Sequence, residues 1–323
     1  MTIALLAVAL VAGFIVLIVA GDILVRGSAA LAQRAGVPPL IVGLTIVAFG
    51  TSAPELFVSI QAVLSDAPKL AIGNIVGSNI ANILLVLSIP AFFAAVPTDS
   101  SGAGRNTVIM IIASFALIIC SVDGRLTFFD GAALFVGIII YLVFQGVRAR
   151  AHRSAPDVQE LTDLEGIGLP ASWTKIGAFV GVGLIGLPIG GWLIVKGGVG
   201  IADALSVPRE FIGLTVVAFG TSLPELATSV VAAVRRHSEV AIGNVVGSNV
   251  FNVFAVGGAA AMTGPIPVPV TFSIWDYPVM MIASFALLGL VLLRRRIGWA
   301  TGAVFFLAYL GYIFGLAWLE DII

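Results

Sequence analysis

The sequence predicts an all-α integral membrane protein with ten transmembrane helices, arranged as two inverted repeats of five helices each. Composition, a series of long apolar stretches and an internal duplication support this prediction. Of the 323 residues, 59% are hydrophobic and only 10% are charged, and the mean hydropathy is +1.14. Soluble domains carry about 25% charged residues, so a soluble enzyme, a nucleic-acid-binding protein and a disordered scaffold are excluded.

Ten apolar stretches follow one another along the chain, and a bilayer span needs about 20 such residues. The stretches are long and continuous rather than short and alternating, which predicts helices rather than a β-barrel. They are residues 3–20, 40–64, 70–94, 106–121, 129–147, 176–195, 210–233, 240–262, 277–293 and 299–318.

One long polar stretch, residues 148–175, separates the fifth and sixth apolar stretches. Its mixed charge and short length are typical of a linker and not of a folded domain. We therefore expect a first five-helix repeat at 1–147, a cytoplasmic linker, and a second repeat at 176–323.

The basic residues predict the orientation, because cytoplasmic loops carry an excess of Lys and Arg. With the N-terminus outside, twelve of the 16 basic residues lie on the inner side and four on the outer side. Compact loops without a targeting extension indicate a prokaryotic membrane. We expect a multi-pass protein of the plasma (inner) membrane, in contact with lipid and with both termini outside.

Residues 42–82 and 212–252 are copies of one another, with 23 identities in 41 positions at a constant offset of 170. The identities include polar residues and glycines, so they do not reflect apolar composition alone. Each half holds an odd number of spans, so the two copies cross the membrane in opposite directions. Inverted repeats are typical of alternating-access transporters, with the binding site near the midplane.

Two carboxylates, Glu55 and Glu225, lie in the middle of predicted spans and are related by the duplication. An unpaired carboxylate at that depth is unfavourable by several kcal/mol, and no Lys or Arg is expected nearby. The partner is therefore a mobile cation, or the group is protonated. A neutral glutamic acid that only joins helices is the structural alternative, which the occurrence of two matching groups disfavours.

Each glutamate follows a proline, in the motifs GTSAPE at 50–55 and GTSLPE at 220–225. Proline lacks an N–H and crowds the carbonyl four residues earlier, so we expect a break in each helix. Freed carbonyl oxygens in a membrane must line a polar cavity or bind a ligand, and hard cations prefer oxygen. The carbonyls expected to become free are near Ala48, Thr51, Ala218 and Thr221.

The second part of each copy carries a polar stripe with a spacing of four residues, which places it on one helix face. The stripes are Asn74, Ser78 and Asn82, and Asn244, Ser248 and Asn252. Adhesion between helices is the simpler interpretation and holds for the GxxxG pairs in the same segments. For Ser78, Asn82, Ser248 and Asn252 we favour ligation or positioning of a ligand.

Two carboxylates give the site a charge of −2, which one Ca²⁺, two Na⁺ or two protons would neutralise. Two ionised carboxylates close together repel one another strongly in a poorly solvated site. The empty site is therefore unfavourable, and a carrier that does not cross the membrane empty is an exchanger.

The motifs GTSAPELFVS…GNIVGSNIAN and GTSLPELATS…GNVVGSNVFN resemble the α-repeats of the Ca²⁺/cation antiporter superfamily. The resemblance is greatest to its bacterial and archaeal sodium/calcium exchanger-like branch. It implies a monomer without a resident cofactor that exchanges Na⁺ for Ca²⁺ at four central cation positions. It also implies that the first and sixth helices, here 3–34 and 176–203, slide across the rest.

The resemblance also implies ligands, carried over residue by residue. For Ca²⁺ they are the carboxylates of Glu55 and Glu225 and the carbonyls of Thr51 and Thr221. For Na⁺ they include the carbonyls of Ala48 and Ala218 and the hydroxyls of Ser78 and Ser248. The ion path would be lined by Ser52 and Ser222.

The chain departs from this pattern where some relatives, including the K⁺-dependent branch, carry an aspartate. Here both positions are asparagine, Asn82 and Asn252, which we count among the metal ligands. The departure argues against K⁺ co-transport and leaves the Na⁺ stoichiometry open.

Na⁺/Ca²⁺ antiport is the leading hypothesis. Antiport of Ca²⁺ or another divalent cation against protons is the alternative, because two glutamates can also carry two protons. An uncoupled cation channel is a further class. An intramembrane hydrolase is disfavoured because the two histidines, His152 and His237, lie in predicted loops. We expect no enzyme activity.

Overall fold

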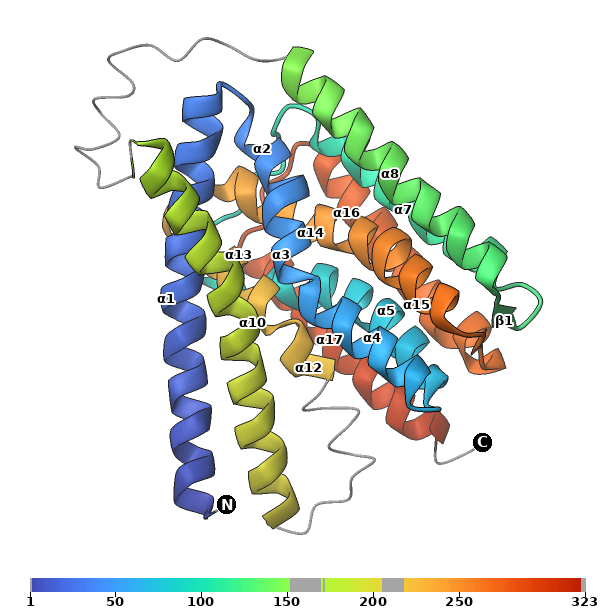
Figure 1. Ribbon diagram of the computed structural model, residues 1–323. Helices are drawn as coiled ribbons and strands as arrows, with labels where there is room; N and C mark the ends of the chain where they lie inside the picture. The colour runs from blue at the N-terminus through green and yellow to red at the C-terminus, as the bar shows by residue number, and fades with distance from the viewer. Residues whose placement is uncertain (1, 152–169, 171, 205–217, 321–323) are drawn as a thin grey trace.

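Helices make up nearly all of the computed structural model, which describes residues 2–151, 170, 172–204 and 218–320 (Figure 1). Among these residues, eight helices are long and apolar enough to span a bilayer, and a bent pair brings the number to nine. The expected span at 210–233 is described only from residue 218 onward, and most of the linker at 148–175 lies outside the described residues. The predicted helical membrane fold is confirmed.

The first half runs from α1 to α8, with π-helical segments labelled η. Its elements are α1 (Ile3–Ala35), α2 (Pro39–Val42), η1 (Gly43–Val47), α3 (Ala48–Thr51), α4 (Ala53–Leu64), α5 (Pro68–Ala81), η2 (Asn82–Val86), α6 (Ser88–Phe93), α7 (Ala103–Cys120), β1 (Arg125–Leu126) and α8 (Phe128–Ala151).

The described part of the second half has a similar helix order, but its strand comes before the last two helices and it has the additional π-helical segment η5. Its elements are α10 (Trp173–Ala204), α12 (Ala218–Thr221), α13 (Leu223–Val234), α14 (Ser238–Phe251), η4 (Asn252–Gly257), α15 (Gly258–Thr263), β2 (Ile266–Pro267), η5 (Phe272–Asp276), α16 (Tyr277–Leu292) and α17 (Trp299–Glu320). The strands β1 and β2 pair antiparallel and join the two halves.

The first helix is longer than the apolar stretch at 3–20 that predicts it. It starts at the N-cap Thr2, whose side chain accepts a hydrogen bond from the Leu5 N–H. It continues past the polar Asp22 and Arg26 and ends only at Gly36, which adopts the left-handed conformation (φ 66°). Hydropathy sets the length of the apolar part, whereas the glycine cap sets the length of the helix.

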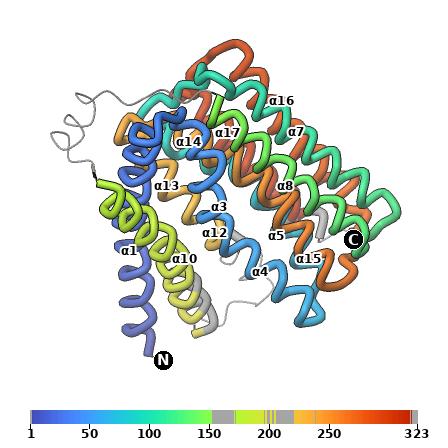
Figure 2. Tube along the Cα trace, turned by 45° about the horizontal axis from the view of Figure 1, so that its top comes forward, coloured from blue at the N-terminus to red at the C-terminus, as the bar shows by residue number. Residues whose placement is uncertain are grey.

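The two long helices α1 and α10 lie side by side and antiparallel along one flank of the molecule (Figures 1 and 2). Glycines allow their backbones to approach closely. A Cβ at Gly13 would lie 2.8 Å from the Ile194 nitrogen, and one at Gly183 would lie 2.8 Å from the Leu24 Cα. Small residues at such contacts are the usual means of tight helix packing in a membrane.

An ion pair joins α1 to the second half of the chain. Asp22 Oδ1 accepts from Arg235, at 2.7 Å from Nε and 2.6 Å from one terminal nitrogen. Arg235 directly follows the last residue of α13, so the pair ties the long helix to the end of a central helix. Arg26, one turn along α1, lies 3.6 Å from the other oxygen of Asp22.

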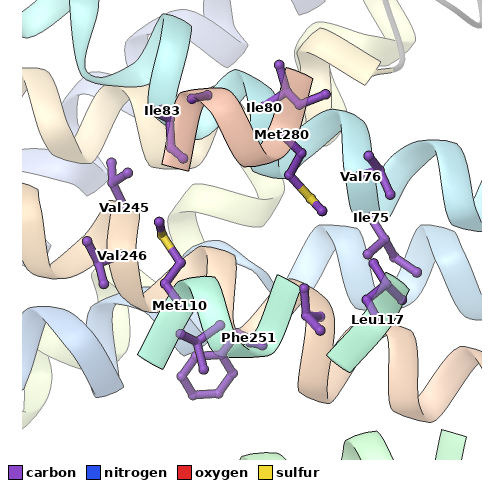
Figure 3. Close-up of a cluster of buried hydrophobic side chains, with 14 of the residues drawn as sticks. Ile75, Val76, Ile80, Ile83, Met110, Leu117, Val245, Val246, Phe251 and Met280 are labelled. Atoms are coloured by element: carbon purple, nitrogen blue, oxygen red, sulfur yellow. The ribbon is translucent and has the colours of Figure 1, made fainter. Parts of the chain in front are cut away.

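The two halves are interlaced, since helices of each half pack into the other. Helix α14 packs against α2, η1 and α3, and α13 packs against α6. Gly243 and Gly247 permit the first of these contacts, because Cβ atoms there would lie 2.7 Å from the Leu40 oxygen and 2.8 Å from the Leu44 oxygen, respectively. Apolar side chains of α5, α7, α14 and α16 fill the centre, with Met110 and Met280 at equivalent positions (Figure 3).

We predict that Gly183→Ala lowers the thermal stability of the protein, because the added methyl group meets the backbone of Leu24. Overpacking of this kind typically costs about 1–3 kcal/mol. Gly181→Ala, two residues earlier in α10, is the matched control, since a Cβ there meets no described atom within 4 Å. Unfolding temperatures in detergent compare the two variants with wild type. Equal temperatures for Gly183→Ala and Gly181→Ala would contradict the close packing of α1 on α10.

Candidate cation site

The predicted helix breaks are present in both halves, at the serine two residues before the proline. In the first half α3 ends at Thr51 and α4 begins at Ala53; the intervening Ser52 has φ −81° and ψ 2°. In the second half Ser222 has φ −85° and ψ 2°. The break in the first half bends the span by 41°. The same short motif thus produces the same local structure twice.

One expectation about these breaks is wrong. The Ala48 carbonyl is not free, because it accepts the Ser52 N–H at 3.0 Å and lies 3.3 Å from the Thr51 hydroxyl. The break covers one residue, and helical bonding resumes at once with the Leu56 N–H on the Ser52 carbonyl at 3.1 Å. Pro54 has no N–H, so the carbonyl that lacks its helical donor is that of Gly50, four residues earlier.

The predicted site side chains are deeply buried. Both glutamates, Glu55 and Glu225, have no exposed surface. The remaining ones with described side chains, each exposed by at most 4%, are Thr51, Ser52, Ser78, Asn82, Thr221, Ser222, Ser248 and Asn252. Of Ala218 the structure describes only the place in the backbone, at the start of α12.

Contacts across the two halves bring several of these residues together. The Ser52 hydroxyl lies 3.4 Å from Glu225 Oε1 and can donate a hydrogen bond to it. The Thr51 and Ser248 hydroxyls lie 3.2 Å apart. Ser78 is buried on α5, but no hydrogen bond among the described residues joins it to either glutamate. Parts of one half therefore complete the surroundings of the glutamate in the other.

Several buried polar atoms of the site have no hydrogen-bond partner among the described residues. They are both carboxylate oxygens of Glu55, Oε2 of Glu225, the Ser222 hydroxyl, Oδ1 of Asn82 and both side-chain polar atoms of Asn252. Buried polar groups are normally paired, and each unpaired one costs about 1–3 kcal/mol. All but one of these atoms are oxygens, so the set fits a cation.

The donor chemistry selects a class of cation. No cluster of three or more His, Cys, Asp or Glu side chains occurs in the described part of the chain. Carboxylate, hydroxyl and amide oxygens without nitrogen or sulfur ligands suit hard cations such as Ca²⁺ rather than Zn²⁺ or Cu²⁺.

Two π-helical segments mark the site and were not predicted. η2 begins at Asn82 and η4 begins at Asn252, the two asparagines that close the polar stripes. Single π-helical turns occur frequently at functional sites. The halves differ here, because the Asn82 amide donates to Asn249 Oδ1 at 3.0 Å whereas Asn252 has no partner among the described residues.

A second unpredicted feature joins the centres of α5 and α14. The Asn79 amide donates to the Asn249 carbonyl at 3.4 Å, and the Asn249 amide donates to the Asn79 carbonyl at 3.2 Å. The sulfur atoms of Met280 and Met110 lie 4.0 and 3.5 Å from the same two amides. The repetition of GSN in both copies could have predicted this pairing. The spacing of four residues instead selected the neighbouring stripe residues as the candidate ligands.

A third buried carboxylate, Asp276, lies elsewhere and is 4% exposed. It ends η5, and the Tyr312 hydroxyl of α17 donates to it at 2.7 Å. The apolar stretch at 277–293 begins one residue later, so hydropathy places Asp276 outside the span. Its donor is a tyrosine on α17, and it contacts none of the predicted ligands through a described hydrogen bond.

These features define a multi-pass helical membrane protein in which two inverted copies of one motif enclose an oxygen-rich site. Residues 5–147 and 175–318 match the family described as sodium/calcium exchanger protein. The chain belongs to this family, whose members are transporters and not enzymes. The resemblance that the motifs carry is confirmed.

Individual relatives cover nearly the whole chain. The putative antiporter CaxA of Alkalimonas amylolytica is 34% identical over 305 residues, covering 93% of this chain and 95% of that protein. The inner membrane protein YrbG of Escherichia coli (strain K12) is 35% identical over 288 residues, covering 86% and 87%. A solved structure of the sodium-calcium exchanger NCX_Mj, soaked with Na⁺ and Sr²⁺, superposes with a TM-score of 0.84 at 29% identity, covering 97% and 98%.

We predict that Asn79→Ala and Asn249→Ala each lower the unfolding temperature, since each leaves a buried partner unpaired at a cost of about 1–3 kcal/mol. The double variant should lose about the sum of the two, because each hydrogen bond joins one side chain to the main-chain carbonyl of the other residue, which the second substitution leaves in place. Ser114→Ala is the control, as this buried hydroxyl bonds only within its own helix, to the Met110 carbonyl at 3.1 Å. Thermal unfolding in detergent measures all four variants, and losses no larger than that of Ser114→Ala would refute the reciprocal pairing.

Proposed function

We propose that this protein is a secondary active antiporter that exchanges Na⁺ for Ca²⁺ by alternating access at a site built on Glu55 and Glu225. One observation carries the proposal: the carboxylate oxygens of both glutamates are fully buried, and most of them have no hydrogen-bond partner among the described residues. A group buried in this way requires a cation or a proton.

Charge balance explains why such a site would exchange ions. No ion pair found in the described part of the chain includes either glutamate. The site therefore carries up to two negative charges, which one Ca²⁺ or two Na⁺ would balance. With neither ion bound, the two carboxylates repel in a poorly solvated environment. Only the loaded forms are then favourable enough to change access, which couples the two fluxes.

The proposed ligands come from both halves of the chain. Glu55 and Glu225 bind Ca²⁺ together with the carbonyls of Thr51 and Thr221. The Na⁺ positions add the hydroxyls of Ser78 and Ser248 and the carbonyls of Ala48 and Ala218. Asn82 and Asn252 complete the set of metal ligands, while Ser52 and Ser222 line the path. Because the Ala48 carbonyl already accepts a backbone N–H, its ligation would require a shared or shifted hydrogen bond.

The names of similar proteins support this assignment. The protein named sodium/calcium exchanger MaX1, of Methanosarcina acetivorans, is 28% identical over 336 residues, and NCX_Mj is named a sodium-calcium exchanger. The YrbG relative is named an inner membrane protein. We propose a plasma (inner) membrane location with both termini outside, a monomer, and no resident cofactor or nucleic-acid partner.

Neutralising either glutamate should abolish exchange. Glu55→Gln and Glu225→Gln keep the shape of the side chain and remove the charge that attracts the cation. Asp276→Asn is the matched control, because it neutralises a buried carboxylate that contacts Tyr312 instead of the site. We expect less than one tenth of wild-type ⁴⁵Ca²⁺ flux for each glutamine variant and near wild-type flux for Asp276→Asn. Normal flux in either glutamine variant would show that the carboxylates are structural.

The coupling ion is tested in proteoliposomes loaded with Na⁺. We expect ⁴⁵Ca²⁺ uptake when Na⁺ is diluted outside, and no uptake when an equal pH gradient replaces the Na⁺ gradient. An ionophore that collapses the Na⁺ gradient should stop uptake. Uptake that follows only the pH gradient would instead make the protein a Ca²⁺/H⁺ antiporter, with the same glutamates carrying protons.

A further inference from the structure

Asn74, which the proposed ligand set does not include, makes three contacts at the centre of the molecule. Its amide nitrogen donates to the Glu55 carbonyl at 3.2 Å and to the Ser59 hydroxyl at 2.9 Å, both within its own half. Its Oδ1 accepts a hydrogen bond from the hydroxyl of Thr221, in the other half, at 3.2 Å. The side chain is 9% exposed.

Asn244 repeats this pattern in the second half. Its amide nitrogen donates to the Glu225 carbonyl at 3.4 Å and to the Ser229 hydroxyl at 3.3 Å. Its Oδ1 accepts from the Thr51 hydroxyl of the first half at 3.0 Å. Each asparagine therefore accepts a hydrogen bond from the threonine of the opposite half.

The chemistry of the partners fixes the orientation of both amides. A main-chain carbonyl can only accept a hydrogen bond, so the atom facing the Glu55 or Glu225 carbonyl must be the amide nitrogen. The opposite atom is then the oxygen, and it faces a threonine hydroxyl, which has one hydrogen to give. Reversing either amide would place its oxygen against the main-chain carbonyl oxygen of a glutamate, so that two acceptors would face one another without a hydrogen.

We infer that Asn74 and Asn244 are positioning residues that join the two half-sites into one. Each asparagine holds the backbone of a glutamate in its own half and, at the same time, the threonine of the opposite half. The inference rests on the proposed function, in which those glutamates and threonines bind the cation. Movement of one half-site is then transmitted to the other through a single side chain.

Residues that orient metal ligands typically change metal affinity by about 10–100-fold when they are replaced. We therefore expect Asn74→Ala and Asn244→Ala to raise the Ca²⁺ concentration for half-maximal exchange by at least about tenfold. Thr51→Val and Thr221→Val should have similar effects, because each removes the donating hydroxyl. Thr51→Ser keeps that hydroxyl and should retain a Ca²⁺ affinity near that of wild type.

The two halves supply matched double-variant cycles. Asn244→Ala with Thr51→Val, and Asn74→Ala with Thr221→Val, combine residues that touch, so each double variant should be little worse than its poorer single variant. For the crossed pairs, Asn244 with Thr221 and Asn74 with Thr51, the structure describes no hydrogen bond between the two side chains, and their losses should multiply. Affinity is measured as the Ca²⁺ dependence of ⁴⁵Ca²⁺ flux and of the unfolding temperature.

If the losses of Ca²⁺ affinity combine in the same way in the matched and the crossed double variants, the inference is overturned. If the alanine variants fail to fold, the comparison of Thr51→Val with Thr51→Ser decides, since equal affinities there would also overturn it. Wild type and Glu225→Gln are measured alongside. A wild-type protein that does not respond to Ca²⁺ refutes the proposed function itself, whereas a responsive wild type with additive matched cycles refutes only the role of the asparagines.

Discussion

Two carboxylates enclosed between apolar helices are the constraint on which the rest of the structure depends. Neither Glu55 nor Glu225 has exposed surface, and neither forms an ion pair with a described residue. Such groups are tolerated only where oxygens, amides and a counter-charge surround them. The helix breaks before each glutamate and the polar stripes of α5 and α14 supply these neutral groups. Under the proposed function, the counter-charge is the transported cation.

The surroundings of each glutamate come from both halves of the chain. Ser52 of the first half reaches Glu225, and Thr51 reaches Asn244, while Thr221 of the second half reaches Asn74. Packing follows the same rule, since α14 lies on α2, η1 and α3. The site is therefore a property of the assembled pair of repeats, and neither repeat contains a complete one.

The sequence was sufficient for features that depend on local chemistry. Hydropathy located the helices, and the proline of each GTSxPE motif predicted a helix break, which the structure places at Ser52 and Ser222. Features that depend on a tertiary partner were missed. The reciprocal pairing of Asn79 with Asn249, and the π-helical turns at the ends of the stripes, require two helices to meet at one register. Nothing in the spacing of a single helix encodes that meeting.

The ion pair between Asp22 and Arg235 has no equivalent in the other half, because the positions related by the offset of 170 hold Trp192 and Ser65. Two separate copies of one repeat would form an isologous dimer, in which every substitution appears twice. Joining the copies in one polypeptide removes that restriction. An ion pair can then hold the long helix α1 to α13 without a matching pair on α10, so the two halves of the molecule need not contribute equally to its stability.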